Sequence, residues 1–123
     1  MDTREKILPL ERVPSAMAAG EWLAVAGFFD PLTAEQARRI AAFETGGRGL
    51  LAIVLDEPDT LLTAEARAAL VAGLRTVRLV TVAKPGEWRG VIGQDARVEI
   101  SEDDAGEQRR SAEFVRFVVE RHG

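Results

Sequence analysis

Three apolar runs of strand length recur along the first two thirds of the chain. They occupy residues 21–27 ("EWLAVAG"), 49–55 ("GLLAIVL") and 76–82 ("TVRLVTV"). Their apolar positions are continuous rather than alternating, which is typical of strands covered on both faces, as in a parallel sheet. The pattern therefore predicts three buried parallel strands.

The segment between the first two strands has the period of a helix. In "LTAEQARRIAAFETGG" (32–47), Thr33 is placed to act as the N-cap and Gln36 as its capping-box partner three residues later. Gly46 and Gly47 are expected to end the helix. The inward stripe is expected to consist of Ala37, Ile40 and Ala41.

The segment between the second and third strands repeats this pattern. In "LTAEARAALVAGL" (62–74), Thr63 is expected to cap the helix. The helical period predicts an apolar face made of Ala66, Leu70, Val71 and Leu74.

Alternation of strands and helices predicts the fold class. We expect an α/β protein with right-handed crossovers and a Rossmann-like doubly wound parallel sheet, forming one domain over residues 1–123. Before the first strand, "SAMAAG" (15–20) is a candidate short helix. After the third, "EWRGVIG" (87–93) and "ARVEIS" (96–101) are candidate strands. A last helix over 104–121 would bury Phe114, Phe117 and Val118.

Composition narrows the class of protein further. The formal net charge is -4 with both signs interspersed, which argues against a nucleic-acid-binding surface. We expect no membrane span and no signal peptide, and hence a cytoplasmic domain. The chain has no cysteine, and its one histidine, His122, is next to the last residue. Thiolate chemistry is excluded, and only His122 would be available for histidine-based catalysis or metal binding.

Four stretches in the same order resemble the cytidylyltransferase-like nucleotidyltransferases, and among these the heptose-phosphate and glycerol-phosphate enzymes. They are "KILPLERV" (6–13), "AVAGFFDPL" (24–32), "GLLAIVLDEPD" (49–59) and "LLTAEARAALVAGLRTVRLVTV" (61–82). The second is similar to the family's strand and G-x-F-D-x-L turn. The fourth is similar to its ERAxxLxxLxxVDxVV helix and strand, with Arg67 and Leu74 in register.

The resemblance implies a nucleotide site, and the residues that would perform its chemistry are replaced. The family signature continues H-x-G-H, where both histidines contact nucleotide phosphates. This chain has Thr33, Glu35 and Gln36 at the histidine, glycine and histidine positions. Threonine and glutamine cannot supply an imidazolium. A carboxylate in the first helical turn would repel a triphosphate by ~4 kcal/mol at ~4 Å and an effective dielectric near ~20.

Two other parts of this chain also lack the phosphate-contacting residues of the family pattern. The lysine-bearing loop that follows the second strand in active relatives corresponds here to the acidic "DEPDT" (56–60). The family's late serine–threonine motif is reduced to Ser111, because Ala112 and Glu113 follow it. The resemblance thus marks the following vestigial nucleotide-site positions and no catalytic residue: Gly27, Phe28, Phe29, Asp30, Thr33, Glu35, Gln36, Asp56, Arg67 and Ser111.

Each conspicuous side chain also has a purely structural interpretation. We expect Asp30 and Asp56, at the carboxyl ends of strands, to be caps or solvated groups rather than metal ligands. A solvated helix face explains Arg38, Arg39 and Arg67 better than an anion site does. Packing explains Trp22 and Trp88 better than stacking on a base.

The resulting hypothesis is a degenerate, non-catalytic member of the family that acts by association. The resemblance implies a homodimer or an active paralogue as partner, and no metal or cofactor is expected. The alternative is an active enzyme that transfers a nucleotidyl group from a nucleoside triphosphate, with Mg²⁺, to a sugar or polyol phosphate. A third hypothesis is a domain that binds a neutral or cationic small molecule in the former pocket.

Overall fold

A five-stranded mixed sheet forms the centre of the protein. The structure is a computed structural model that describes residues 2–17, 19–43, 46–92, 97–99 and 114–121. The strand order is β3-β2-β1-β5-β4. The strands are β1 (Gly20–Gly27), β2 (Leu50–Leu55), β3 (Leu79–Ala83), β4 (Arg97–Glu99) and β5 (Phe114–Arg121).

The first three strands are parallel, and the last two turn the sheet antiparallel. In the parallel part, Leu23 lies opposite Leu50 and Leu51 lies opposite Leu79. β5 runs antiparallel to both β1 and β4. The α/β class and the three predicted strands are confirmed, whereas the sheet as a whole is mixed rather than purely parallel.

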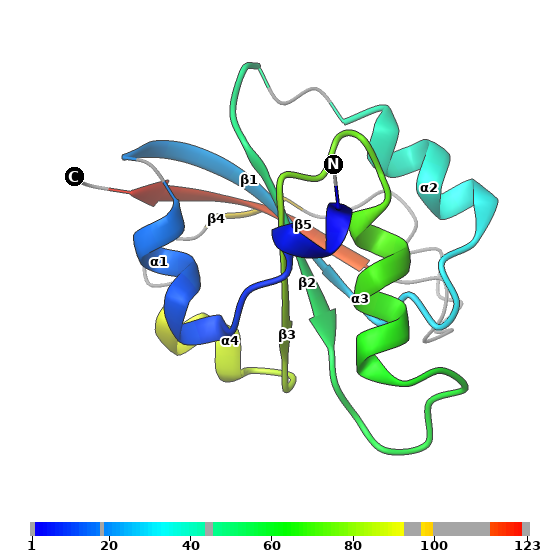
Figure 1. Cartoon of the computed structure of the whole chain (residues 1–123). Helices are drawn as coiled ribbons and strands as arrows, with labels where there is room; N and C mark the ends of the chain where they lie inside the picture. Colours follow the sequence, from blue (N-terminus) through cyan, green and yellow to red (C-terminus); the bar gives the residue numbers. More distant parts are fainter. Residues whose placement is uncertain (1, 18, 44–45, 93–96, 100–113, 122–123) are drawn as a thin grey trace.

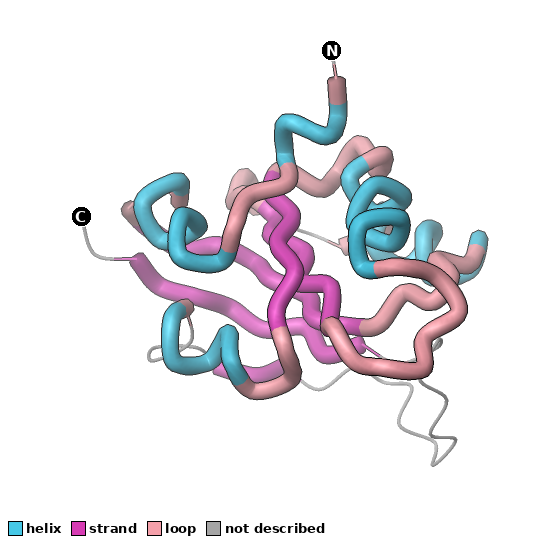
Figure 2. The backbone as a smooth tube through the Cα atoms, turned by 60° about the horizontal axis from the view of Figure 1, so that its bottom comes forward, coloured by secondary structure: helices cyan, strands magenta, loops and turns pink. Residues whose placement is uncertain are grey.

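Helices cover both faces of this sheet (Figures 1 and 2). One face carries α2 (Ala34–Ala41) and α3 (Ala64–Ala72), with the 3-10 helix η1 (Thr3–Lys6) beside α3. The other face carries α1 (Val13–Ala16) and α4 (Glu87–Val91), together with η2 (Leu10–Arg12). Within the described part of the chain, no helix is long and apolar enough to cross a membrane.

Two hydrophobic cores explain why the strands are continuously apolar. In β1, Leu23 and Val25 pack into the core under α2 and α3, whereas Trp22 and Ala24 face the core under α1 and α4. Successive side chains of a strand point to opposite faces, so a sheet covered twice has apolar residues at every position. Trp22 and Trp88 are both buried in the second core, which confirms that they are packing residues.

The structure corrects two predictions after residue 83. The expected strand over 87–93 begins as helix α4, in a turn where the Glu87 N–H donates to the Lys84 carbonyl at 2.9 Å and Trp88 is buried. The expected helix over 104–121 is wrong at its end, because residues 114–121 form β5, which pairs with β1 along its whole length. That segment is aromatic and β-branched, so it favours a strand once a sheet edge is available. Residues 104–113 lie outside the described part. The strand expected over 96–101 is confirmed for its central residues by β4.

The inward faces of both predicted helices are shifted. In α2, Ile40 is buried as expected, but Ala41 is exposed and is the last helical residue, ahead of the predicted glycine end. In α3, Ala66 and Leu70 are exposed, whereas the buried residues are Arg67, Ala68, Val71 and Ala72. The buried stripe of α3 differs from the predicted one because the side chain of Arg67 occupies part of the inward face.

Candidate functional site

The turn after β1 is an irregular, buried piece of backbone at the carboxyl ends of the parallel strands. Gly27 ends β1 and is buried. Phe29 is fully buried and has a φ of 49°, a left-handed conformation that is rare for a bulky residue. The following Asp30–Pro31 peptide is cis. Phe29 keeps its positive φ only because the surrounding structure fixes the backbone from several sides.

Asp30 fixes the turn from one side. One of its carboxylate oxygens accepts the backbone N–H of Leu61 at 2.6 Å, and the other accepts that of Leu62 at 2.8 Å. Both N–H groups belong to the loop that leads into α3. The carboxylate therefore connects the turn after β1 with the loop after β2, and its two oxygens are both engaged by main chain. Asp30 therefore bridges two loops and does not cap a helix, since the N-cap of α3 is Thr63.

Arg67 fixes the same region from inside the protein. Its Nη1 donates to the carbonyls of Phe28 and Leu55, each at 2.8 Å, and its Nε donates to the carbonyl of Leu62 at 3.2 Å. The side chain is fully buried, so the prediction of a solvated helix face is wrong for this residue. The carbonyls belong to backbone that leaves the sheet, and a buried guanidinium supplies the donors that they need.

One nitrogen of this guanidinium is less well satisfied. Nη2 is buried and has no hydrogen bond within the described residues. Oδ1 of Asp56 lies 3.9 Å from it, on a carboxyl side chain that is 48 % exposed. Asp56 lies just after β2 as predicted, and its backbone N–H donates to the carbonyl of Ala83 at 2.8 Å. The long ion pair is thus a partial charge balance for Arg67.

The N-terminus of α2 is closed by its own side chains. The Thr33 hydroxyl accepts the N–H of Gln36, and Oε1 of Gln36 accepts the N–H of Thr33, both at 3.1 Å. The predicted capping box is therefore confirmed, and Gln36 is buried. Glu35 is exposed in the first turn of the helix. The N–H groups to which a phosphate would bind at such a helix start are here partly used by the protein itself.

The structure brings most of the predicted positions into one region and leaves one outside. Phe28 and Asp30 meet Arg67 and the loop before α3, while Asp56 reaches Arg67 from the end of β2. Ser111 lies outside the described residues. No group of three or more acidic or histidine side chains within the described part is arranged to hold a metal ion.

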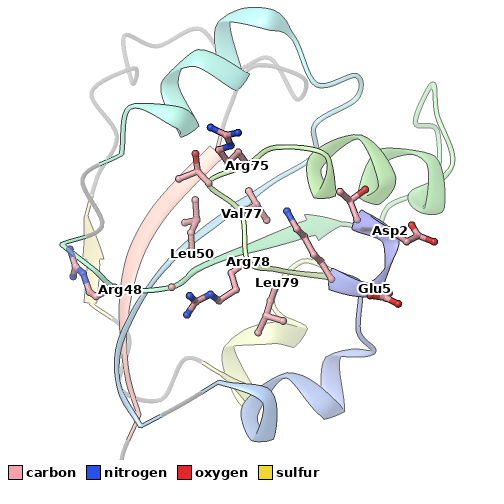
Figure 3. A pocket seen from close by; sticks show the side chains of 12 residues that line it. Asp2, Glu5, Arg48, Leu50, Arg75, Val77, Arg78 and Leu79 are labelled. Atoms are coloured by element: carbon pink, nitrogen blue, oxygen red, sulfur yellow. The ribbon is translucent and has the colours of Figure 1, made fainter.

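A second feature, at the opposite edge of the sheet, was not predicted from the sequence. Residues just before β2 and just before β3, together with η1, surround a cavity of about 590 Å³ (Figure 3). Its charged side chains are those of Asp2, Glu5, Lys6, Arg48, Arg75 and Arg78. We call this cavity the amino-edge groove, because parallel strands place their amino ends at one edge. The signal in the sequence was the arginines, Arg48 and Arg78, that lie one or two residues before two parallel strands.

Both signs of charge occur at η1, and only cations occur at the strand ends. Asp2 is the N-cap of η1, and Glu5 and Lys6 lie on it, whereas the three arginines lie near the beginnings of β2 and β3 (Figure 3). Hydrogen bonds from the Arg4 side chain and backbone N–H to its carboxylate hold the pKa of Asp2 below its usual range. Asp2 is therefore a charged group at neutral pH.

Comparison of the chain with family models, with curated proteins and with solved structures gave no match.

Proposed function

We propose that this chain is a Rossmann-like, cytidylyltransferase-like domain without catalytic activity, and that it functions by association with a second copy of itself or with an active relative. The observation that carries the non-catalytic part is the state of Asp30. Both of its carboxylate oxygens accept main-chain N–H groups, at 2.6 and 2.8 Å. A carboxylate engaged in this way stabilises two loops, and its orientation is set by the main chain, which supports a structural role for Asp30 over a catalytic one.

The start of α2 supports the same proposal. In a nucleotidyltransferase, this helix start would offer open N–H groups and a cation to the phosphates. Here the side chains of Thr33 and Gln36 each accept the backbone N–H of the other, and the charged side chain of the first turn is the exposed carboxylate of Glu35. The local field is therefore less favourable for a triphosphate than that of an open helix start.

Association is supported by the apolar side chain that the Asp30 contact presents to solvent. Leu61 is 82 % exposed, although its backbone N–H is held by a carboxylate. A large apolar side chain on a fixed backbone loses little conformational freedom when a partner covers it. We propose Leu61 as a contact residue of the associated form.

Sedimentation velocity over a range of protein concentrations tests this proposal. We expect a concentration-dependent dimer, and we expect Leu61→Asp to shift it toward the monomer. The matched control is Val91→Asp, which places the same charge on an exposed apolar position of α4. A wild-type chain that stays monomeric at every concentration would rule out self-association, and an equal loss in both variants would exclude Leu61 as the contact.

A further inference from the structure

The cationic side chains of the amino-edge groove differ in how far the protein already uses them. Arg75 is exposed, and within the described part of the chain it has no hydrogen bond or ion pair. Lys6 uses one of its three N–H bonds, donating from Nζ to the carbonyl of Leu74 at 3.2 Å. Arg48 is 3.4 Å from a carboxylate oxygen of Glu21. Arg75 and Lys6 therefore retain donors for a ligand.

Arg78 is held in place by an apolar surface rather than by an acid. Its guanidinium carbon lies 5.9 Å from the centroid of the Trp22 ring. The Trp22 ring is in turn packed against Gly49, since a Cβ atom at that position would lie 2.5 Å from a ring carbon. A guanidinium over a fixed aromatic ring is pre-oriented and keeps its N–H groups for a partner.

Charge and size together define the ligand that this groove would accept. The groove has four cationic and two acidic side chains, in a chain whose net charge is -4. One of the acids, Asp2, is already hydrogen-bonded by Arg4. A volume of about 590 Å³ is that of a small-molecule site rather than of a single-ion site. Arginine forks bind phosphate and carboxylate oxygens through paired hydrogen bonds.

We propose that the amino-edge groove binds a small organic molecule carrying a multivalent oxyanion group. Arg75, Arg78 and Lys6 supply the cations for the oxyanion. Figure 3 shows the guanidinium groups of Arg75 and Arg78 on different sides of the groove, so these two side chains approach the ligand from different directions. Glu5 lies on η1 with Lys6, and it favours a hydroxyl or amino group on the part of the ligand next to it. This site lies at the edge of the sheet opposite to Asp30 and Asp56, and it does not depend on the function proposed for the turn.

Inorganic pyrophosphate without metal is the first probe, and glucose is the uncharged comparison. At low ionic strength we expect saturable binding of pyrophosphate in the millimolar range or tighter, measured by amide chemical shifts. The amides that move should be those of Gly49 and of residues 75–79. Raising the salt concentration to about 0.2 M should weaken binding severalfold, because the contacts are exposed charges. Glucose alone should produce no saturable shift.

Two substitutions and a charge-matched control complete the test. Arg75→Ala removes a side chain without a described partner, and Arg78→Gln keeps an aliphatic stem over Trp22, so both variants should fold. Together they should lower the affinity for pyrophosphate by about tenfold or more. The control, Arg12→Ala with Arg38→Ala, removes two exposed arginines outside the groove. It should change the affinity for pyrophosphate by less than about twofold. Absence of saturable binding, shifts confined to other amides, or an equal loss in the control would overturn the proposal.

Discussion

Asp30 accepts the backbone N–H of Leu62 at 2.8 Å, across 32 positions of sequence. Its other oxygen accepts the neighbouring N–H of Leu61. One side chain thus joins the turn after β1 to the loop that precedes α3. Because two hydrogen bonds to a charged acceptor are lost together when this carboxylate is removed, the contact should be visible in the stability of the whole domain.

Replacing Asp30 with alanine should therefore lower the free energy of unfolding by about 2–4 kcal/mol. Equilibrium unfolding in urea measures this change. The charge-matched control is Glu11→Ala, which removes an exposed carboxylate from η2 and should change stability by less than about 0.5 kcal/mol. If both variants have the same stability, the Asp30 contact does not stabilise the fold.

Arg67 should tolerate no substitution that leaves its carbonyl partners without donors. Lysine keeps the charge but cannot reach the carbonyls of Phe28, Leu55 and Leu62 at the same time. We expect Arg67→Lys to lower the free energy of unfolding by about 2 kcal/mol or more, and Arg67→Met by about 3–5 kcal/mol. Urea unfolding measures both, and a wild-type midpoint for Arg67→Met would contradict the role assigned to this guanidinium.

Placing residues of the nucleotidyltransferase signature at the start of α2 should cost stability and create no nucleotide site. Glu35→Gly with Gln36→His removes the amide that accepts the Thr33 N–H and places glycine in a helix. We expect a loss of about 1–2 kcal/mol of unfolding free energy. Calorimetric titration with MgATP should detect no new site. A new saturable site that is absent from wild type would mean that the pocket is still present behind the capping box.

Gly49 and Trp22 give a prediction about packing. A methyl group at Gly49 would lie 2.5–2.8 Å from three carbon atoms of the Trp22 ring, which is only 4 % exposed. Gly49→Ala should lower the free energy of unfolding by about 1–3 kcal/mol. The matched control is Gly90→Ala in α4, where the added carbon has no atom within 4 Å and alanine is the better helix former. A neutral Gly49→Ala would contradict the close contact.

The pH dependence of one groove residue follows from its neighbour. Because hydrogen bonds from Arg4 lower the pKa of Asp2 in the folded state, this carboxylate stabilises the fold above the unfolded pKa of about 3.8. The contribution fades as the pH falls through the lower folded value. Carboxyl chemical shifts measured against pH should give a pKa for Asp2 below the ordinary range, and Arg4→Ala should raise it. An unchanged pKa in that variant would exclude Arg4 as the cause.

How much of this could be predicted from the sequence depends on how local each feature is. The capping box joins residues three apart, so Thr33 and Gln36 could be identified from their spacing. The burial of Arg67 depends on carbonyls that lie 12 and 39 positions away, and no local pattern reveals them. The strand β5 was misassigned for a related reason, because its pairing with β1 spans nearly the whole chain.

The amino-edge groove is hidden from local sequence patterns for a different reason. Arg48 and Arg78 each precede a strand by one or two residues, and a single arginine there is unremarkable. Only the parallel pairing of β2 with β3 brings the two segments to one edge. Given the prediction of parallel strands, that juxtaposition could have been inferred.

The most direct test of the proposal that the turn after β1 serves the fold rather than a nucleotide is an amide chemical-shift titration with MgATP and MgCTP. Because the signals are resolved by residue, binding at the turn is separated from binding of a phosphate tail in the amino-edge groove. We predict that the amides of residues 27–36 and of Asp56 do not shift with millimolar nucleotide, whatever happens at residues 75–79. Saturable shifts at Thr33, Glu35 and Gln36, with a stabilisation above about 1 kcal/mol, would contradict it.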